Sequence, residues 1–142
     1  MKTVLENSTF CIQSTRVVFS NEIKPASLHI ENGKISKIGK LDEFQNHKIK
    51  DFGNLVVAPG IVDTHAHINE PGRTDWEGFQ TATKAAAAGG ITTVIDMPLN
   101  SIPATTSLAA LETKIASAKG KCAINYGFWG GVILCHHRSI FV

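Results

Sequence analysis

Two histidines stand one residue apart at the end of an apolar run, in the segment GIVDTHAHINEPGRTDWEGF, residues 60–79. If residues 60–67 form a strand, side chains alternate between its faces, and Asp63, His65 and His67 lie on one face. Two imidazoles at this spacing can reach one divalent ion, and neutral imidazole suits zinc and similar metals. The alternative is a pair of surface or core histidines without a ligand role. Two ligands are also too few for a catalytic zinc, which usually takes three or more from the protein.

Strand-like and helix-like segments alternate around and after this pair. The patterns predict strands in 60–67, 91–98 and 122–134, with helices over 74–90 and 105–120 between them. The apolar, β-branched middle strand is typical of a strand buried on both faces. This βαβαβ order predicts a parallel sheet with right-handed crossovers. The histidines then lie at the carboxyl end of the first strand, where parallel α/β sheets and barrels place their chemistry.

Cap signals and periodicity define the two expected helices. Thr74 or Asp75 is expected to cap the first helix, and Gly89-Gly90 to end it. Thr105 or Thr106 is expected to cap the second helix, and Gly120 to end it. The second helix is predicted to bury an apolar stripe formed by Leu108, Leu111 and Ile115.

The residues before the histidine pair predict a different architecture. Residues 15–20, 26–30, 34–39 and 52–60 read as short strands, with a break over 21–25. Asn32-Gly33 is a strong signal for a hairpin turn. We therefore expect a small antiparallel sheet ahead of the alternating region.

Composition limits the possible functions of the chain. The 142 residues are 43% hydrophobic and 18% charged, which is typical of a globular protein. The net charge of +2 comes without a basic stripe, so nucleic acid is not an expected partner. No apolar run reaches the ~18 residues of a membrane span, and the start shows no secretory signal. Cys11, Cys122 and Cys135 predict reduced thiols in a cytosolic-type compartment, with a disulfide as the alternative.

Two joined motifs carry a resemblance to a known family. The segment VVAPGIVDTHAH resembles the start of the amidohydrolase superfamily barrel, after its small N-terminal β-sandwich. The runs HAHINEPGRTDWEGF and GGITTVIDMPLNSIPAT are similar to the allantoinases in particular. Dihydroorotases carry an arginine two residues after the second histidine, where this chain has Asn69, and hydantoinases lack the NEPGRTDWEGF run. The resemblance covers roughly residues 8–131.

The resemblance implies an α/β fold in three parts. Residues 1–58 correspond to the N-terminal part of the β-sandwich domain, and residues 59–131 to the first three βα units of a (β/α)₈ TIM barrel. Residues 132–142 show nothing family-like. Because such a barrel takes about 250 residues, we expect a truncated barrel in this chain.

The resemblance also implies roles for individual residues. His65 and His67 match the two N-terminal histidine ligands of a dinuclear zinc centre. Asn100 matches a position that contacts substrate, while Asn69 and Arg73 lie where they can orient a ureide or its ring. The family opens the hydantoin ring of allantoin to allantoate, using a water ionised between two metals and an aspartate that delivers the proton.

Other interpretations stay open for several of these residues. Arg73 can be a solvated loop charge or form an ion pair with Glu70, Asp75 or Glu77. Asn100 can simply favour a turn. Asp63 can hold a ligand imidazole from behind or serve barrel packing, and Glu70 and Asp96 are weaker candidates.

The zinc centre that the family builds is incomplete in this sequence. Its bridging carboxylated lysine, two further histidines and catalytic aspartate come from later strands, so we assign no catalytic residue here. Four lysines on predicted helices or loops are no substitute for the bridging lysine: Lys84, Lys114, Lys119 and Lys121. The tail residues Cys135, His136 and His137 are poor replacements, because adjacent histidines face opposite sides of a strand.

The prediction is therefore an allantoinase-type hydrolase, with this chain as an inactive truncated form. The alternatives are a dihydroorotase- or hydantoinase-like enzyme, or a non-catalytic fragment that binds full-length subunits. The expected small-molecule partner is allantoin, and the resemblance implies a homo-oligomer for the full-length form. The expected location is the cytoplasm, with a peroxisome or mitochondrion left open.

Overall fold

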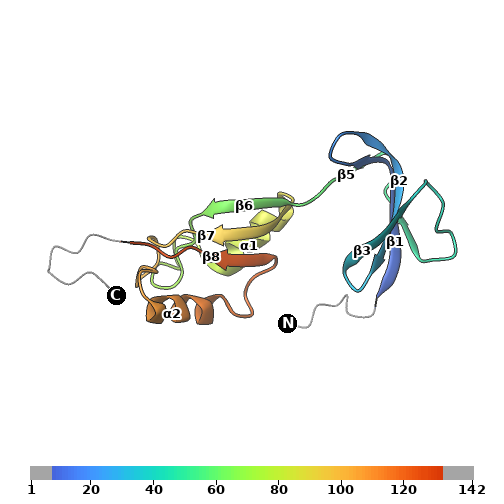
Figure 1. The fold of residues 1–142 in the computed structure, drawn as a ribbon. Coiled ribbons are helices and arrows are strands. Elements are labelled where there is room, and N and C mark those ends of the chain that lie inside the picture. The colour runs from blue at the N-terminus through green and yellow to red at the C-terminus, as the bar shows by residue number, and fades with distance from the viewer. Residues whose placement is uncertain (1–7, 133–142) are drawn as a thin grey trace. The chain divides into compact units, whose positions relative to one another are not determined.

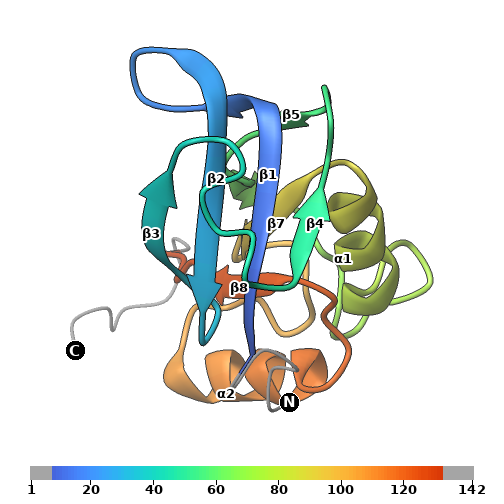
Figure 2. The same ribbon diagram turned by 90° about the vertical axis from the view of Figure 1, so that its right-hand side faces the viewer.

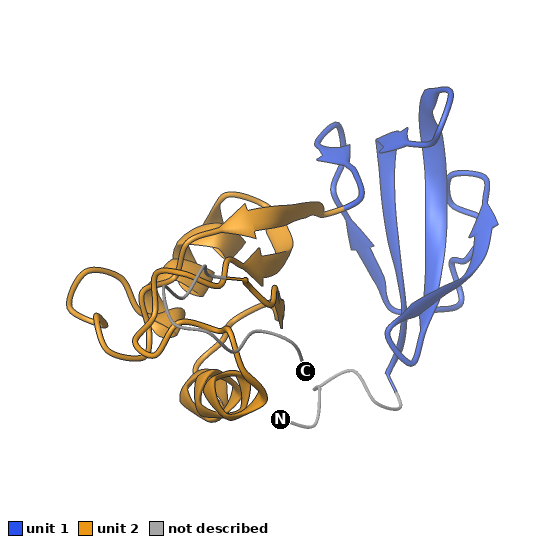
Figure 3. Ribbon diagram, turned by 60° about the vertical axis from the view of Figure 1, so that its left-hand side comes forward, with its two compact units in different colours: residues 1–59 blue, residues 60–142 orange. Residues whose placement is uncertain are grey.

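The computed structural model describes residues 8–132 and divides the chain into two compact units, residues 1–59 and 60–142 (Figure 3). Each unit has its own sheet and its own hydrophobic cluster. Except for Val132, the tail expected over residues 132–142 lies outside the described residues. No described helix has both the length and the apolar character needed to cross a membrane.

Unit 1 is a five-stranded mixed sheet in the order β3-β2-β1-β4, with β5 also paired to β1. Its strands are β1 (Thr9–Val18), β2 (Ile23–Glu31), β3 (Lys34–Gly39), β4 (Ile49–Asp51) and β5 (Val56–Val57). The first three are antiparallel as predicted, but β4 and β5 run parallel to β1. The expectation of a purely antiparallel sheet is wrong, because residues 40–48 carry the chain back and β4 enters in the direction of β1. Figure 2 shows β4 on the far side of β1 from β2 and β3.

The first two strands are longer than the predicted segments 15–20 and 26–30, and Pro25 lies inside β2 rather than breaking it. The β1–β2 register shifts between Ser14 and Val17, so two residues of β1 lie opposite Pro25 in a β-bulge. Proline cannot donate to the ladder and is tolerated at such an interruption. The break expected from sequence is therefore a local bulge within a continuous pair of strands.

The hairpin and packing of unit 1 follow from its sequence. Asn32 and Gly33 join β2 to β3 with φ values of 52° and 75°, so the predicted hairpin turn is confirmed. Four buried residues form the hydrophobic cluster: Val17, Ala26, Leu28 and Ile30. Cys11 is buried, which raises the pKa of its thiol, and both it and Cys122 are free thiols.

Unit 2 is a three-stranded parallel sheet in the order β6-β7-β8, with one helix in each crossover (Figure 1). Its elements are β6 (Ile61–Ala66), α1 (Phe79–Ala88), β7 (Ile91–Asp96), α2 (Leu108–Ala118) and β8 (Asn125–Phe128). The predicted βαβαβ order and the α/β fold class are confirmed. All three strands end at the same edge of the sheet, and the loops after β6 and β7 leave from that edge.

Both helices begin later than predicted. A helix start at residues 74–75 was expected, but α1 begins at Phe79, whose N–H donates to the Glu70 carboxylate at 2.9 Å. The N-cap of α2 is Ser107 rather than a preceding threonine, and its hydroxyl accepts an N–H of the first turn at 3.3 Å. The predicted end of α1 is confirmed, since Gly89 is its C-cap.

The buried stripe of α2 is not the predicted one. Leu108 is 71% exposed and Ile115 is 44% exposed. The buried residues recur at every fourth position and are Ala110, Lys114 and Ala118. The prediction is wrong because the face of α2 turned inward carries two alanines and a lysine, and the long lysine side chain reaches a buried carboxylate of β7.

The apolar cluster of unit 2 lies between the helices and one face of the sheet. Ile68, Phe79, Val94 and Ala118 are its buried members. Strand β7 alternates in burial, with Thr92 exposed, so it is not buried on both faces as expected.

We expect Phe79→Ala to lower the free energy of unfolding by about 3–5 kcal/mol, because it empties a fully buried aromatic site. The matched control is Leu108→Ala, which removes a large apolar side chain from an exposed position and should change stability by less than about 0.5 kcal/mol. Urea denaturation of the two variants measures both values. Equal losses would show that α2 buries the stripe predicted from sequence.

Candidate functional site

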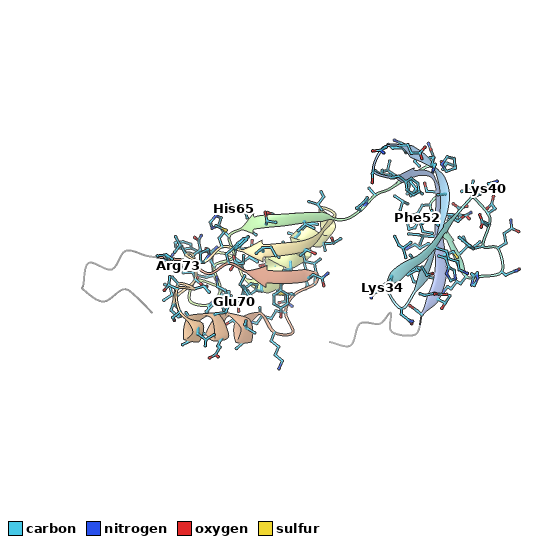
Figure 4. All side chains as sticks on the ribbon, viewed as in Figure 1. Lys34, Lys40, Phe52, His65, Glu70 and Arg73 are labelled. Atoms are coloured by element: carbon cyan, nitrogen blue, oxygen red, sulfur yellow. The ribbon has the colours of Figure 1, made fainter. Side chains whose placement is uncertain are left out.

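The two histidines come together at the carboxyl end of β6. His65 lies in the strand and His67 follows its last residue, and the ring centroids are 5.1 Å apart at an interplanar angle of 61°. Both side chains are exposed, and neither ring is hydrogen-bonded to another described residue. Figure 4 shows His65 at the strand end from which the loop with Glu70 and Arg73 departs.

Asp63 does not hold either imidazole. Its Oδ1 accepts the backbone N–H of His65 at 3.0 Å. The β6–β7 register shifts between Asp63 and Ala66, so the regular alternation assumed from sequence is interrupted there. The contact steadies the strand backbone before the histidine pair.

The loops after β6 and β7 are joined beside the histidines. The Asn100 side-chain amide donates to Asn69 Oδ1 at 3.2 Å, and Ile102 N–H donates to the carbonyl of Pro71 at 2.8 Å. Gly72 has a φ of 93°, and a Cβ there would lie 2.6 Å from the Ile102 side chain. A larger residue at Gly72 would push the loops apart. The structure thus brings together two of the three residues for which sequence implied substrate contact.

Arg73 lies on the same loop but makes a different contact from the ion pairs considered. Its guanidinium carbon is 5.0 Å from the centre of the Trp76 ring. Among the described residues it forms no ion pair with Glu70, Asp75 or Glu77. A guanidinium stacked on an aromatic face keeps its N–H donors available at the ring edge.

Glu70 has a structural role that sequence did not reveal. The carboxylate is buried, accepts the Phe79 N–H at the start of α1, and pairs with the ammonium of Lys121. It fixes the loop after β6 to α1 and to the turn after α2. Glu70 lies nine positions before the first residue of the helix it caps, so no local capping pattern could have indicated it.

Asp96 is the second buried carboxylate that sequence undervalued. It lies at the end of β7, is 1% exposed, and pairs with Lys114 at 2.7 Å. Burial raises the pKa of the Asp96 carboxyl, and the Lys114 ammonium opposes that rise. The available signal was the spacing of Lys114 between two alanines on one helix face.

The chemistry of the histidine pair suits a metal ion, because neutral imidazole binds zinc and similar metals. The 5.1 Å between the ring centroids keeps the two rings close enough to reach one ion. No group of three metal-binding side chains occurs within residues 8–132. Lys84, Lys119 and Lys121 are exposed, and Lys114 is committed to Asp96. Cys135, His136 and His137 lie outside the described residues.

The comparisons with known proteins agree with this arrangement. Residues 56–136 match the amidohydrolase family, and the chain belongs to that family. Its curated relatives include a mitochondrial allantoinase from Aquarana catesbeiana, 53% identical over 125 residues, which cover 86% of this chain and 26% of that protein. An allantoinase from Streptomyces avermitilis is 49% identical over 124 residues, covering 86% of this chain and 28% of the relative. The predicted resemblance to the allantoinases is confirmed.

Solved structures place the fold in the same group of enzymes. The L-hydantoinase of Arthrobacter aurescens superimposes with a TM-score of 0.68 at 28% identity, over 85% of this chain and 28% of that one. The chain spans about a quarter of the length of the curated relatives it matches.

If His65 and His67 bind zinc, the double variant His65→Ala/His67→Ala should remove it, because residues 8–132 contain no group of three metal-binding side chains that could hold the ion instead. The control variant His136→Ala/His137→Ala also removes two neighbouring imidazoles and should keep the zinc. Equilibrium dialysis with elemental analysis measures bound zinc per chain. Loss of zinc only in the control would place the site in the tail.

Proposed function

We propose that this chain forms the N-terminal corner of the active site of an allantoinase-type cyclic amidohydrolase, which opens the hydantoin ring of allantoin to allantoate. The observation that carries the proposal is the adjacency of the histidine pair to the bonded amides of Asn69 and Asn100. The 53% identity to an allantoinase supports the choice of substrate class.

His65 and His67 are the proposed metal ligands. Zinc supplies Lewis-acid activation of water near neutral pH when it is bound. In the proposed dinuclear centre, the remaining ligands and the proton-transferring aspartate would come from outside residues 8–132. The role of residues 60–105 is to hold two ligands and to orient the ring.

The amide pair suits a neutral cyclic amide. Because Asn100 donates to Asn69 Oδ1, the Asn69 amide N–H groups and the Asn100 carbonyl oxygen remain available. A hydantoin ring presents both carbonyl and N–H groups, which one donor and one acceptor can match. Arg73 offers further donors to the ureide carbonyl from the same loop.

The dihydroorotase and hydantoinase alternatives are less well supported. Asn69 occupies the position at which dihydroorotases carry an arginine, and a neutral amide lacks the charge for a carboxylate substrate. The Arthrobacter hydantoinase is 28% identical, whereas the two allantoinases are 49–53% identical.

A chimera tests the assignment. Residues 8–132 replace the matching segment of the Aquarana catesbeiana allantoinase, and kcat/KM is measured for allantoin, dihydroorotate and hydantoin. We expect allantoin to be the preferred substrate. Asn100→Ala should lower kcat/KM for allantoin about 10- to 100-fold, the equivalent of one lost polar contact of about 1.5–3 kcal/mol.

The matched control is Asn125→Ala, at the opposite end of the sheet, which should leave kcat/KM unchanged. A chimera that prefers dihydroorotate or hydantoin contradicts the substrate assignment. If Asn100→Ala behaves like the control, Asn100 is a turn residue only.

A second candidate function is association with longer subunits of the same family. Strands β6 and β8 each pair only with β7 among the described residues, and Val62 and Tyr126 on them are 56% and 37% exposed. Open strand edges and exposed apolar side chains favour pairing with another chain. A homo-oligomeric full-length form would supply such a partner.

We expect a tagged chain to co-purify with a full-length allantoinase and Val62→Lys to weaken the association, because charge on an edge strand opposes pairing. Lys84→Ala, which alters an exposed residue of α1, is the control. Absence of co-purification with the unaltered chain rules out this function.

The cytoplasm is the proposed location. The two described cysteines are free thiols, as a reducing compartment allows. The relative from Aquarana catesbeiana is named as mitochondrial, so an organelle is the alternative.

A further inference from the structure

The buried ion pair between β7 and α2 is the least expected feature of unit 2. Lys114 is 0% exposed and Asp96 is 1% exposed, with Nζ and Oδ2 2.7 Å apart. The ammonium also donates to the carbonyl of Met97 at 3.1 Å and lies 6.0 Å from the centre of the Phe128 ring. One lysine therefore fixes both the side chain of Asp96 and the backbone that follows it.

The second oxygen of Asp96 reaches the loop that carries the site. Oδ1 accepts the N–H of Ile68 at 2.6 Å, and this peptide joins His67 to Ile68. On the other side of His67, the carbonyl of Ala66 accepts the N–H of Met97 at 2.8 Å. The backbone is thus held on both sides of His67 by two consecutive residues at the end of β7.

The same point is tied to the third strand. Trp129 N–H donates to the Asp96 carbonyl at 2.9 Å, and the Trp129 indole N–H donates to the carbonyl of Thr64 at 2.9 Å. Hydrogen bonds therefore join the ends of β6, β7 and β8 around Asp96. A shift of its carboxylate would move the segment that leads to His67.

We propose that the Asp96–Lys114 pair is a positioning device for the site: Lys114 holds the Asp96 carboxylate so that it fixes the peptide between His67 and Ile68. This inference rests on the proposed metal-binding role of His67 and the proposed substrate role of Asn69. Neither Asp96 nor Lys114 is proposed to contact metal or substrate. Both act through the backbone of the residues that do.

Stability alone does not require this pair. Replacing a buried ion pair by apolar residues of similar volume is often neutral or stabilising, whereas removing one partner leaves a costly unpaired charge. An apolar pair could not accept the Ile68 N–H, and a carboxylate without Lys114 would lose the partner that sets its orientation. The arrangement fits a demand for geometry in the metal-binding loop.

The test compares Lys114→Met, the double variant Asp96→Asn/Lys114→Met and the control Lys121→Met, all in the full chain. Lys121→Met removes the other ion pair to a buried carboxylate, that of Glu70. Cobalt(II) is the probe, followed by visible absorption, and urea denaturation gives the stability of each variant. Amide hydrogen exchange of Ile68 is measured without metal.

We expect Lys114→Met to weaken cobalt binding about 10-fold, the lower end of the range for losing a group that hydrogen-bonds a metal ligand directly, and to change the absorption band. Ile68 N–H should exchange faster. In the double variant, stability should recover because no buried charge is left unpaired, while cobalt binding stays weak. Lys121→Met should retain the cobalt affinity and the absorption band.

Recovery of cobalt affinity together with stability in the double variant would show a purely structural role and overturn the proposal. Unchanged Ile68 exchange in both Lys114 variants would overturn it as well. If the unaltered chain binds no cobalt through His65 and His67, the proposed metal role fails by itself. The exchange of Ile68 then still decides whether the pair positions this loop.

Discussion

The arrangement of the strand ends in unit 2 depends on the hydrogen bonds that the Asp96 carboxylate accepts. Its two oxygens accept from the Ile68 N–H and from the Lys114 ammonium, so one buried side chain joins the loop after β6 to helix α2. A buried carboxylate with fewer donors would be unfavourable, because the group loses water on both oxygens. Ala110 and Ala118 share the buried face of α2 with Lys114, whose long side chain carries the ammonium to the carboxylate. The burial of this face of α2 and the pairing of the Asp96 carboxylate therefore depend on each other.

Further contacts join the two loops that border the histidine pair at this strand end. The bond between Asn69 and Asn100, together with the backbone bond from Ile102 to Pro71, makes the loops after β6 and β7 a single surface. The buried Glu70 carboxylate joins the loop after β6 to the start of α1. The exposed histidine rings thus stand on a backbone that is fixed from the sheet side and bordered by amides. Such support limits the reorganisation needed when a ligand binds.

Sequence signals that span only a few residues predicted the order of the elements in unit 2 and the adjacency of the two histidines. Asn32-Gly33 predicts its turn because both residues tolerate positive φ, and Gly89 marks the end of α1 in the same local way. The contacts that the sequence did not predict join residues far apart in the chain. Glu70 caps a helix nine residues away, and Lys114 meets a carboxylate 18 residues away. A charged residue in a helix is usually exposed, so its burial becomes evident only when the facing strand is known.

The residues that hold the backbone of the candidate site differ from those that border it, and this difference bears on the proposed substrate choice. The chain and the Arthrobacter L-hydantoinase are only 28% identical, yet they superimpose with a TM-score of 0.68. The backbone arrangement can therefore be kept while most of the side chains change. In this chain the strand ends are held by the buried Asp96 carboxylate, whereas Asn69 and Arg73 lie on the loop that it holds and contact Asn100 and Trp76. Replacing Asn69 by an arginine would add charge to this loop without removing the buried bonds of Asp96. Under the proposed function, discrimination between a neutral ring and a carboxylate would therefore depend on single loop positions, and the placement of the two histidines would depend on the buried bonds of Asp96.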